Sequence, residues 1–316
     1  MEQSETSLFE LFEKYLLRAD LAESSVELYS RAVKWFVVLF GDVPAGRLSY
    51  EHAEDFKSWL GKGRAKTSAN SYLRGIKPFF SWMHRRRYIE TNPFDQVRLF
   101  RTGDKKIEVY EVDEVQRMFD VADLRWQVII SLALNSMRRA EILNLVISDI
   151  DFEKNMILVS EKKDTKHTWR WRIKNRNQFY IGLPEIVTKL LIRLRDELPI
   201  GQPYICLKHN YYRRNMRLKS ESRLTHEKRN NPWGNFDRDF KSLLRRAIVR
   251  HRRFHDLRAT FATERYNSGY NLKKLQYLLR HSSIQTTARY IKNIDEQKLV
   301  AESAKTFEKH YVSNVP

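Results

Sequence analysis

Near its C-terminal end the chain carries side chains that could transfer a phosphoryl group without a metal ion. His255 stands three positions before Arg258. His281 follows Arg258 by twenty-three positions, and Tyr290 follows nine positions later. A guanidinium fork and imidazoles can hold a phosphate, and a phenol can attack its phosphorus to form a covalent intermediate. The pattern therefore predicts a phosphoryl-transfer site whose nucleophile is a tyrosine.

The charge of the chain indicates which molecule carries the phosphate. The 316 residues include 58 Lys and Arg but only 39 Asp and Glu, which leaves a formal net charge of +19. A field of this sign and size attracts polyanions. The basic residues also cluster, because residues 61–106 hold twelve Lys and Arg against three Asp and Glu. We therefore expect double-stranded DNA to be the partner.

The composition excludes several other classes of protein. A single cysteine, Cys206, rules out an intramolecular disulfide framework and a cysteine-rich zinc site, and agrees with a reducing cytosol. The first thirty residues carry Glu2, Glu5, Glu10 and Glu13 and no continuous apolar stretch, so they are not a signal peptide. The longest apolar runs are too short to cross a bilayer. We expect a cytoplasmic, nucleoid-associated protein with no membrane partner.

The elements that must position the chemical groups fall into two predicted domains, since single cores rarely grow beyond about 250–300 residues. Apolar residues recur at helical spacing over 7–40, 50–60 and 67–87. A polar linker begins at Gly103. We predict a helical DNA-binding domain over residues 1–103 and a catalytic domain over residues 104–316.

The second domain is predicted to be mostly helical with one small sheet, which places the fold in the α+β class (mostly α with a small antiparallel β-sheet). Helical spacing covers residues 113–145, 185–198, 233–249 and most of the chain after 258. Strands are predicted at Met156–Val159, Thr168–Ile173 and Phe179–Leu183. In the middle strand Trp169 and Trp171 share one face, which we expect to be a packing face. Residues 208–230 hold eight Lys and Arg against two Glu without a clear period, and predict a basic surface loop.

Three short stretches together resemble the tyrosine recombinases, the phage-integrase family. The stretch Leu278–Tyr290 resembles the family's pattern L-G-H-S-x-x-x-T-T-x-x-Y, and it matches at His281, Ser282, Thr286, Thr287 and Tyr290. Residues 136–143 look like the family's G-x-R-x-x-E-L box, and His255–Arg258 is similar to its H-x-L-R box. The boxes stand in the family's order and at its separations. The resemblance continues more weakly into residues 7–100, which look like the family's helical, SAM-like core-binding domain.

The resemblance implies a role for each matching residue. Arg138 and Arg258 would stabilise the negative charge that builds on the non-bridging oxygens during cleavage. His281 would donate a further hydrogen bond, and His255 would accept or relay the proton of the nucleophile. Tyr290 would attack phosphorus and form a 3′-phosphotyrosine, with a 5′-hydroxyl as the leaving group. No metal or other cofactor is implied, because the protein cations supply the charge stabilisation.

In the family the leaving hydroxyl takes its proton from a lysine in a β-hairpin. Here the first predicted strand runs into Lys162, Lys163 and Lys166, which resemble the family's K-T-G-K turn. We predict Lys163 as this general acid, with Lys162 and then Lys166 as alternatives. The choice stays open because residues 164–180 contain an insertion of about ten residues relative to compact family members, whose role the sequence does not indicate.

Three positions depart from the family's pattern. Arg280 stands where the family has glycine before the histidine, and could add a phosphate contact or reshape the turn. Asn135 and Ser136 replace the usual Thr-Gly before the first box. Glu141 is expected to be structural, holding a basic side chain at the active site.

These residues predict a metal-independent DNA strand transferase, a site-specific recombinase and integrase of a mobile genetic element. The alternatives are an Xer-type chromosome or plasmid dimer resolvase and a type IB-like topoisomerase, and a regulator that keeps the fold without the reaction. A metal-dependent nuclease is disfavoured because no paired carboxylates have ligand spacing. Family resemblance implies a homo-tetramer on paired DNA sites, with residues 293–316 docking on a neighbouring protomer, and it allows an accessory directionality factor.

Overall fold

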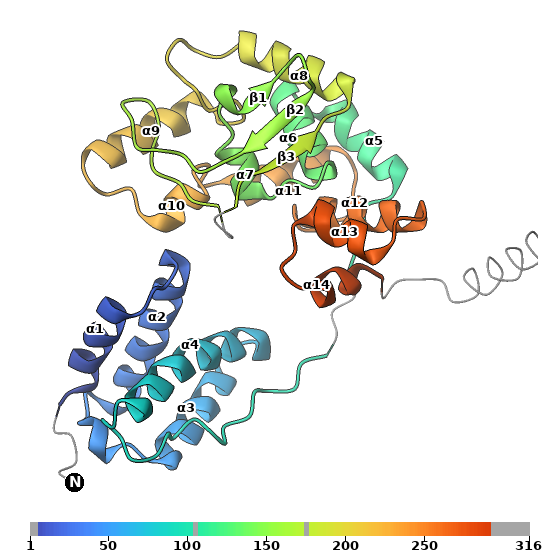
Figure 1. Ribbon diagram of the computed structural model, residues 1–316. Coiled ribbons are helices and arrows are strands. Elements are labelled where there is room, and N and C mark those ends of the chain that lie inside the picture. The colour runs from blue at the N-terminus through green and yellow to red at the C-terminus, as the bar shows by residue number, and fades with distance from the viewer. Residues whose placement is uncertain (1–5, 104–106, 174–176, 292–316) are drawn as a thin grey trace, which may run out of the picture. The chain divides into compact units, whose positions relative to one another are not determined.

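In the computed structural model the chain divides into two compact units, Met1–Asp104 and Lys105–Pro316 (Figure 1). The structure describes residues 6–103, 107–173 and 177–291. The C-terminal segment 293–316, for which docking on a neighbouring protomer was predicted, lies outside these described residues. None of the helices in the described ranges is both long and apolar enough to cross a membrane.

The N-terminal unit is a bundle of helices around an aromatic core. Phe36 lies at its centre, with ring centroids 4.8 Å from Phe40, 5.2 Å from Phe56 and 5.5 Å from Phe80. Such tilted and edge-to-face pairs add to the free energy of burial. The helices are α1 (Leu8–Arg18), α2 (Glu23–Phe40), α3 (Tyr50–Lys62) and α4 (Lys66–Arg85), with the 3₁₀ turn η1 (Ala45–Arg47) between α2 and α3.

The second unit contains one small antiparallel sheet among helices. Its strands are β1 (Ile150–Asp151), β2 (Met156–Val159) and β3 (Phe179–Gly182), in the order β1-β2-β3. Ile157 of β2 pairs with Ile150 of β1 and with Ile181 of β3. The helices before and around the sheet are α5 (Val112–Val121), α6 (Leu124–Leu134), α7 (Arg139–Leu143), η2 (Ile147–Asp149) and α8 (Glu185–Asp196). The later ones are α9 (His209–Ser220), α10 (His226–Asn230), α11 (Phe236–Arg246), α12 (Asp256–Asn267), α13 (Leu272–Leu279), α14 (Ile284–Ala288) and η3 (Arg289–Ile291).

The predicted fold class is confirmed, because helices dominate both units and the sheet is small and antiparallel. The strand predicted at Met156–Val159 matches β2, and the one predicted at Phe179–Leu183 differs from β3 by one residue. The stretch predicted as helical over 113–145 is three separate helices. Asp123 caps the second of them by accepting from the backbone N–H of Trp126 at 2.8 Å.

The prediction of a surface loop over residues 208–230 was wrong, since α9 and α10 occupy most of it. The face of α9 toward the core carries Tyr211, Tyr212, Asn215 and Leu218, all buried. Their spacing of three and four is helical. Two of the four core residues are tyrosines, whose polar ends reduce the difference in hydrophobicity between the buried and the exposed face of α9. For this reason the sequence shows no clear period there, although basic residues fill the remaining positions.

The predicted strand Thr168–Ile173 is reduced to a single bridge, Lys162 with Trp171, among the described residues. Its alternation nevertheless holds in burial, because both tryptophans are buried and Arg170 is exposed. Trp169 stacks on Tyr204 with centroids 4.0 Å apart and donates from Nε1 to the side-chain oxygen of Asn144. The expected packing role of the tryptophans is confirmed.

Candidate active site

The first arginine box begins at the turn between α6 and α7 and continues through α7. Ser136 adopts φ +71°, which reverses the chain after α6 and places Arg138 at the N-cap of α7. The carboxylate of Glu141 accepts from the backbone N–H of Arg138 at 2.8 Å and from its Nη1 at 2.7 Å. Glu141 is 3% exposed, so the expectation that it holds a basic side chain is confirmed. The pair fixes the direction of the Arg138 guanidinium.

Arg258 lies in the first turn of α12 and is almost completely buried. Its Nη1 donates to the carbonyl of Ser136, and its Nη2 donates to the carbonyl of Leu279. Burial lowers the pKa of Arg258 to about 9, helped by the nearby positive charge of Arg138. The guanidinium therefore stays ionised at neutral pH, in a place with little water to screen it.

His281 and Tyr290 lie on the segment that follows α13. The backbone N–H of His281 donates to the carbonyl of Gln276 at 3.1 Å, and its ring Nδ1 is 3.0 Å from Oγ1 of Thr287. The rings of His281 and Tyr290 are nearly parallel, with centroids 5.8 Å apart. Tyr290 is buried against Ala259, Phe261, Ala262 and Leu279. Two helices therefore hold the phenol beside the imidazole.

Both imidazoles are biased toward the neutral form. Burial lowers the pKa of His281 to about 4, and the positive charges of Arg258 and Arg138 lower it further in the same direction. His255, the residue before α12, keeps one side toward solvent. Partial removal from water and the charge of Arg258 lower its pKa as well, with the solvent-facing side weakening the effect.

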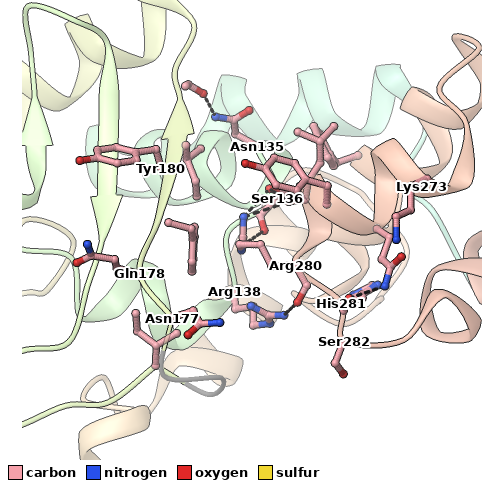
Figure 2. A pocket seen from close by; sticks show the side chains of 18 residues that line it. Asn135, Ser136, Arg138, Asn177, Gln178, Tyr180, Lys273, Arg280, His281 and Ser282 are labelled. Carbon is pink, nitrogen blue, oxygen red and sulfur yellow. Dashed lines mark hydrogen bonds between the residues drawn. The ribbon is translucent and has the colours of Figure 1, made fainter.

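Five of the six predicted residues come together. The positive charge of Arg138 lowers the pKa values of Arg258, His255 and His281. Tyr290 is close enough to Arg258 to act on its pKa in the opposite direction. A cavity of about 790 Å³ opens beside them, lined by Arg138, Arg280 and His281 on one side and by residues of β3 and α13 on the others (Figure 2). Of the five, Arg138 and His281 line the cavity itself. A group of positive charges, neutral imidazoles and a phenol is suited to a phosphodiester.

The sixth predicted residue belongs to the hairpin after β2, where the three lysines have different surroundings. Lys162 is buried, and its Nζ donates to Asp149 at 2.9 Å and to the carbonyl of Ser160 at 2.7 Å. Lys163 and Lys166 are exposed. No contact within the described residues joins the Lys163 Nζ to the other five side chains. The ammonium of Lys162 is thus used in a buried structural ion pair, whereas the exposed Lys163 and Lys166 remain candidates for the general acid.

The hairpin turn is held by the helix that was predicted as a loop. Nζ of Lys219 in α9 donates to the carbonyl of Thr168 at 2.8 Å and also contacts Asp164 and the carbonyl of Thr165. Oγ1 of Thr168 donates to the carbonyl of Lys163 at 2.7 Å. The insertion and the basic segment 208–230 are therefore packed on each other, and together they determine the conformation of the turn that carries Lys163.

Sequence reasoning missed the main-chain carbonyls that hold the arginines. Ser136 and Leu279 present carbonyls to Arg258, and the Arg280 carbonyl accepts from Nη2 of Arg138 at 3.1 Å. A side-chain pattern does not report carbonyl directions. The signal that could have pointed there is the presence of Ser136 and Arg280 at two positions where the family pattern has glycine.

Comparison with known proteins agrees with this geometry. Residues 108–297 match the model of the phage integrase family, and residues 8–90 match that of the phage integrase N-terminal SAM-like domain. A tyrosine recombinase of Thermosipho africanus is 24% identical over 307 residues, covering 93% of this chain and 98% of that protein. A XerC-like tyrosine recombinase of Caldanaerobacter subterraneus is 25% identical over 75% of this chain and 65% of its own length.

Among solved structures, the integrase of transposon Tn1549 in complex with circular intermediate DNA has the same fold. The TM-score is 0.68 at 20% identity, over 94% of this chain and 99% of that chain. The family model covers well over half of the chain, and its residues include all three boxes. The chain is therefore a member of the phage integrase family of tyrosine recombinases, enzymes that transfer DNA strands.

Proposed function

We propose that this recombinase cleaves and rejoins duplex DNA through a covalent 3′-phosphotyrosine and serves as the integrase of a mobile element. The observation that carries the proposal is that Arg138 and Arg258 share the Leu279 carbonyl, while the Tyr290 phenol lies beside His281, and that Arg138 and His281 line one cavity. The six proposed site residues are Arg138, Lys163, His255, Arg258, His281 and Tyr290.

In the proposed reaction, the Tyr290 oxygen attacks phosphorus and forms a P–O bond while the bond to the 5′-oxygen breaks. The phenolic proton passes to the neutral imidazole of His255. The departing 5′-oxygen keeps the electron pair of the broken P–O bond and receives a proton from Lys163. Arg138, Arg258 and the N–H of His281 stabilise the charge on the non-bridging oxygens. Rejoining reverses these steps, with a 5′-hydroxyl of a partner strand attacking the phosphotyrosine.

The experiment that tests the proposal is covalent capture in excess chelator. Wild-type protein is incubated with nicked duplexes tiled over the DNA that flanks its gene, and the products are separated on denaturing gels. A protein–DNA adduct with the protein on the 3′-phosphate is the expected result. A free 5′-phosphate and 3′-hydroxyl without an adduct would indicate hydrolysis and contradict the proposal.

An Xer-type dimer resolvase is the second candidate, because the curated relatives include a XerC-like recombinase. Sequencing of DNA that is covalently captured in cells separates the two. Adducts at the ends of an element that encloses the gene support an integrase. Adducts at one chromosomal site unlinked to the gene support a resolvase. Assembly as a tetramer on two duplexes is proposed for both, and sizing of the protein with captured DNA tests it.

The lowered histidine pKa values predict an unusual pH dependence. Only a neutral imidazole can accept the tyrosine proton, and a pKa below the ordinary 6.5 keeps His255 neutral at lower pH. The second-order rate constant of adduct formation reports the free protein. We expect it to stay level as the pH falls through 6.5, where an ordinary imidazole would protonate, and to fall only toward the lowered pKa of about 4. A decline centred near pH 6.5 would contradict this account of the base.

The lysine assignment predicts a selective chemical rescue. Lys163→Met is expected to slow cleavage by about 10²–10⁴-fold, because the 5′-oxygen then leaves without a proton. A substrate with sulfur at the bridging 5′ position should restore most of the rate, since a thiolate leaves unprotonated. Rates are measured in single turnover on nicked duplexes.

Lys166→Met, an exposed neighbour in the same turn, is the matched control and should lose little with either substrate. Rescue of Lys166→Met in place of Lys163→Met would move the general acid to Lys166. Lys162→Met is expected instead to lower stability by roughly 3–5 kcal/mol, because Asp149 loses its buried partner.

A further inference from the structure

Three arginines share their acceptors in pairs at the candidate active site. The Leu279 carbonyl accepts from Arg258 and, at 3.4 Å, from Arg138. The Ser136 carbonyl accepts from Arg258 and, at 2.7 Å, from Nη2 of Arg280. Glu141 accepts from Arg138 at 2.7 Å and from Arg280 at 3.0 Å. Each pair of arginines is thus joined through one acceptor, and the network closes through Arg280.

Both terminal nitrogens of the Arg280 guanidinium are bound by protein groups. It lies over the ring of Phe179 in β3, 4.1 Å from the ring centroid. Besides the bonds just described, its Nη1 donates to Oγ of Ser136 at 3.2 Å and to the carbonyl of Leu278 at 3.1 Å. Its side chain is 13% exposed. Figure 2 shows it between Ser136 and Arg138, with hydrogen bonds running to neighbouring protein groups. These bonds engage both terminal nitrogens with protein, which does not suit a direct ligand of phosphate.

The backbone is left-handed at Arg280 and at Ser136, the residue to which its guanidinium is bonded. Arg280 has φ +52° and Ser136 has φ +71°, a region that side-chain-bearing residues seldom adopt. Such conformations persist only where the surroundings determine them. Here the two strained residues bind each other, because the Arg280 guanidinium bonds both the carbonyl and the hydroxyl of Ser136. The two departures from the glycine pattern therefore form one structural unit.

We propose that Arg280 is a positioning residue for strand cleavage, which bridges Ser136 and Glu141 and so fixes Arg258 and Arg138 in their paired geometry. This inference rests on the proposed function. Loss of the bridge leaves the Ser136 turn and the Glu141 carboxylate each with one partner fewer. Both remaining arginines can then shift, and a misplacement of about 1 Å can slow a reaction by about 100-fold. Arg280 itself does not contact the phosphate.

The test compares Arg280→Met with wild type on nicked duplex DNA. Three quantities are measured: thermal unfolding, the dissociation constant for DNA at several salt concentrations, and the single-turnover rate of adduct formation at saturating DNA. The expected result is a rate lower by about 10–100-fold, with DNA affinity within about threefold of wild type. The slope of log affinity against log salt should be unchanged, because that slope counts phosphate contacts.

Arg280→Lys is the second variant, in case the methionine variant does not fold. A single ammonium keeps the charge but cannot hold Ser136 and Glu141 with one planar fork, so an intermediate loss of about 3–10-fold is expected. The matched control is Arg195→Met in α8. Arg195 also lies over a phenylalanine, Phe152, and pairs with an acid, Asp196, but it shares no acceptor with Arg138 or Arg258 within the described part of the chain. It should keep the wild-type rate.

The outcomes separate this inference from the function on which it rests. No adduct from wild type would overturn the proposed function and the positioning role together. An adduct from wild type with an undiminished rate in both Arg280 variants would overturn the positioning role alone. A salt slope reduced by about one in Arg280→Met would also overturn it, because Arg280 would then be a direct phosphate ligand.

Discussion

Tyr290→Phe is expected to abolish covalent adduct formation while DNA binding stays within about twofold of wild type. The phenol oxygen is the proposed nucleophile, and a phenylalanine ring fills the same buried position against Ala259, Phe261 and Leu279. The ring also keeps its place beside His281. The measurement is a denaturing gel of protein incubated with nicked duplex in excess chelator, alongside a native binding assay.

Tyr270→Phe, a partly exposed tyrosine just after α12, is the matched control and should form the adduct at the wild-type rate. An adduct that persists in Tyr290→Phe would assign the nucleophile to another side chain. Loss of DNA binding in Tyr290→Phe would instead show that the hydroxyl supports the structure of the segment after α13. Either result would contradict the role proposed for Tyr290.

Arg138→Met is expected to slow cleavage at saturating DNA by about 10²–10³-fold, the usual effect of removing one preorganised donor from a developing charge. The slope of log affinity against log salt should also fall by about one, because one phosphate contact is lost. The fold should tolerate the change. Arg138 is half-buried at the edge of the cavity, and Glu141 keeps its bond to Arg280.

The neighbouring residue is the control for Arg138. Arg139 pairs with the exposed Asp237 and lies over Phe236, away from the shared acceptors of the site. Arg139→Met should therefore keep the wild-type cleavage rate at saturating DNA. Equal losses in the two variants would show that the effect comes from general positive charge rather than from a positioned guanidinium.

The contrast between Arg138 and Arg258 shows why one variant is informative and the other is not. Arg258 is almost completely buried and bonds the carbonyls of Ser136 and Leu279. Replacing it would take one of two donors from each of these carbonyls and remove a fully buried side chain, which lowers stability. A loss of activity in Arg258 variants would thus mix stability with catalysis. Arg138 separates the two more cleanly.

The sequence by itself determined the family and the mostly helical α+β class, and it indicated which side chains to propose for the chemistry. Helical spacing and the alternation of Trp169 and Trp171 follow from the local geometry of the backbone. The period of a helix or a strand therefore appears directly in the order of residue types. The three boxes likewise consist of residues close to one another along the chain. Composition and net charge alone favoured DNA as the partner, because an excess of positive charge attracts a polyanion whatever the fold.

Only the tertiary structure decided how these groups are held. Arg258 bonds a carbonyl 122 positions away, and Arg280 bonds Ser136 across 144 positions, through contacts that no spacing records. The tertiary structure also places Lys162 in a buried ion pair and leaves Lys163 exposed. Residues that were predicted as a loop form a helix that supports the hairpin. The physical reason is that burial and main-chain carbonyl directions arise from packing between distant elements, whereas side-chain patterns report only the neighbours along one element.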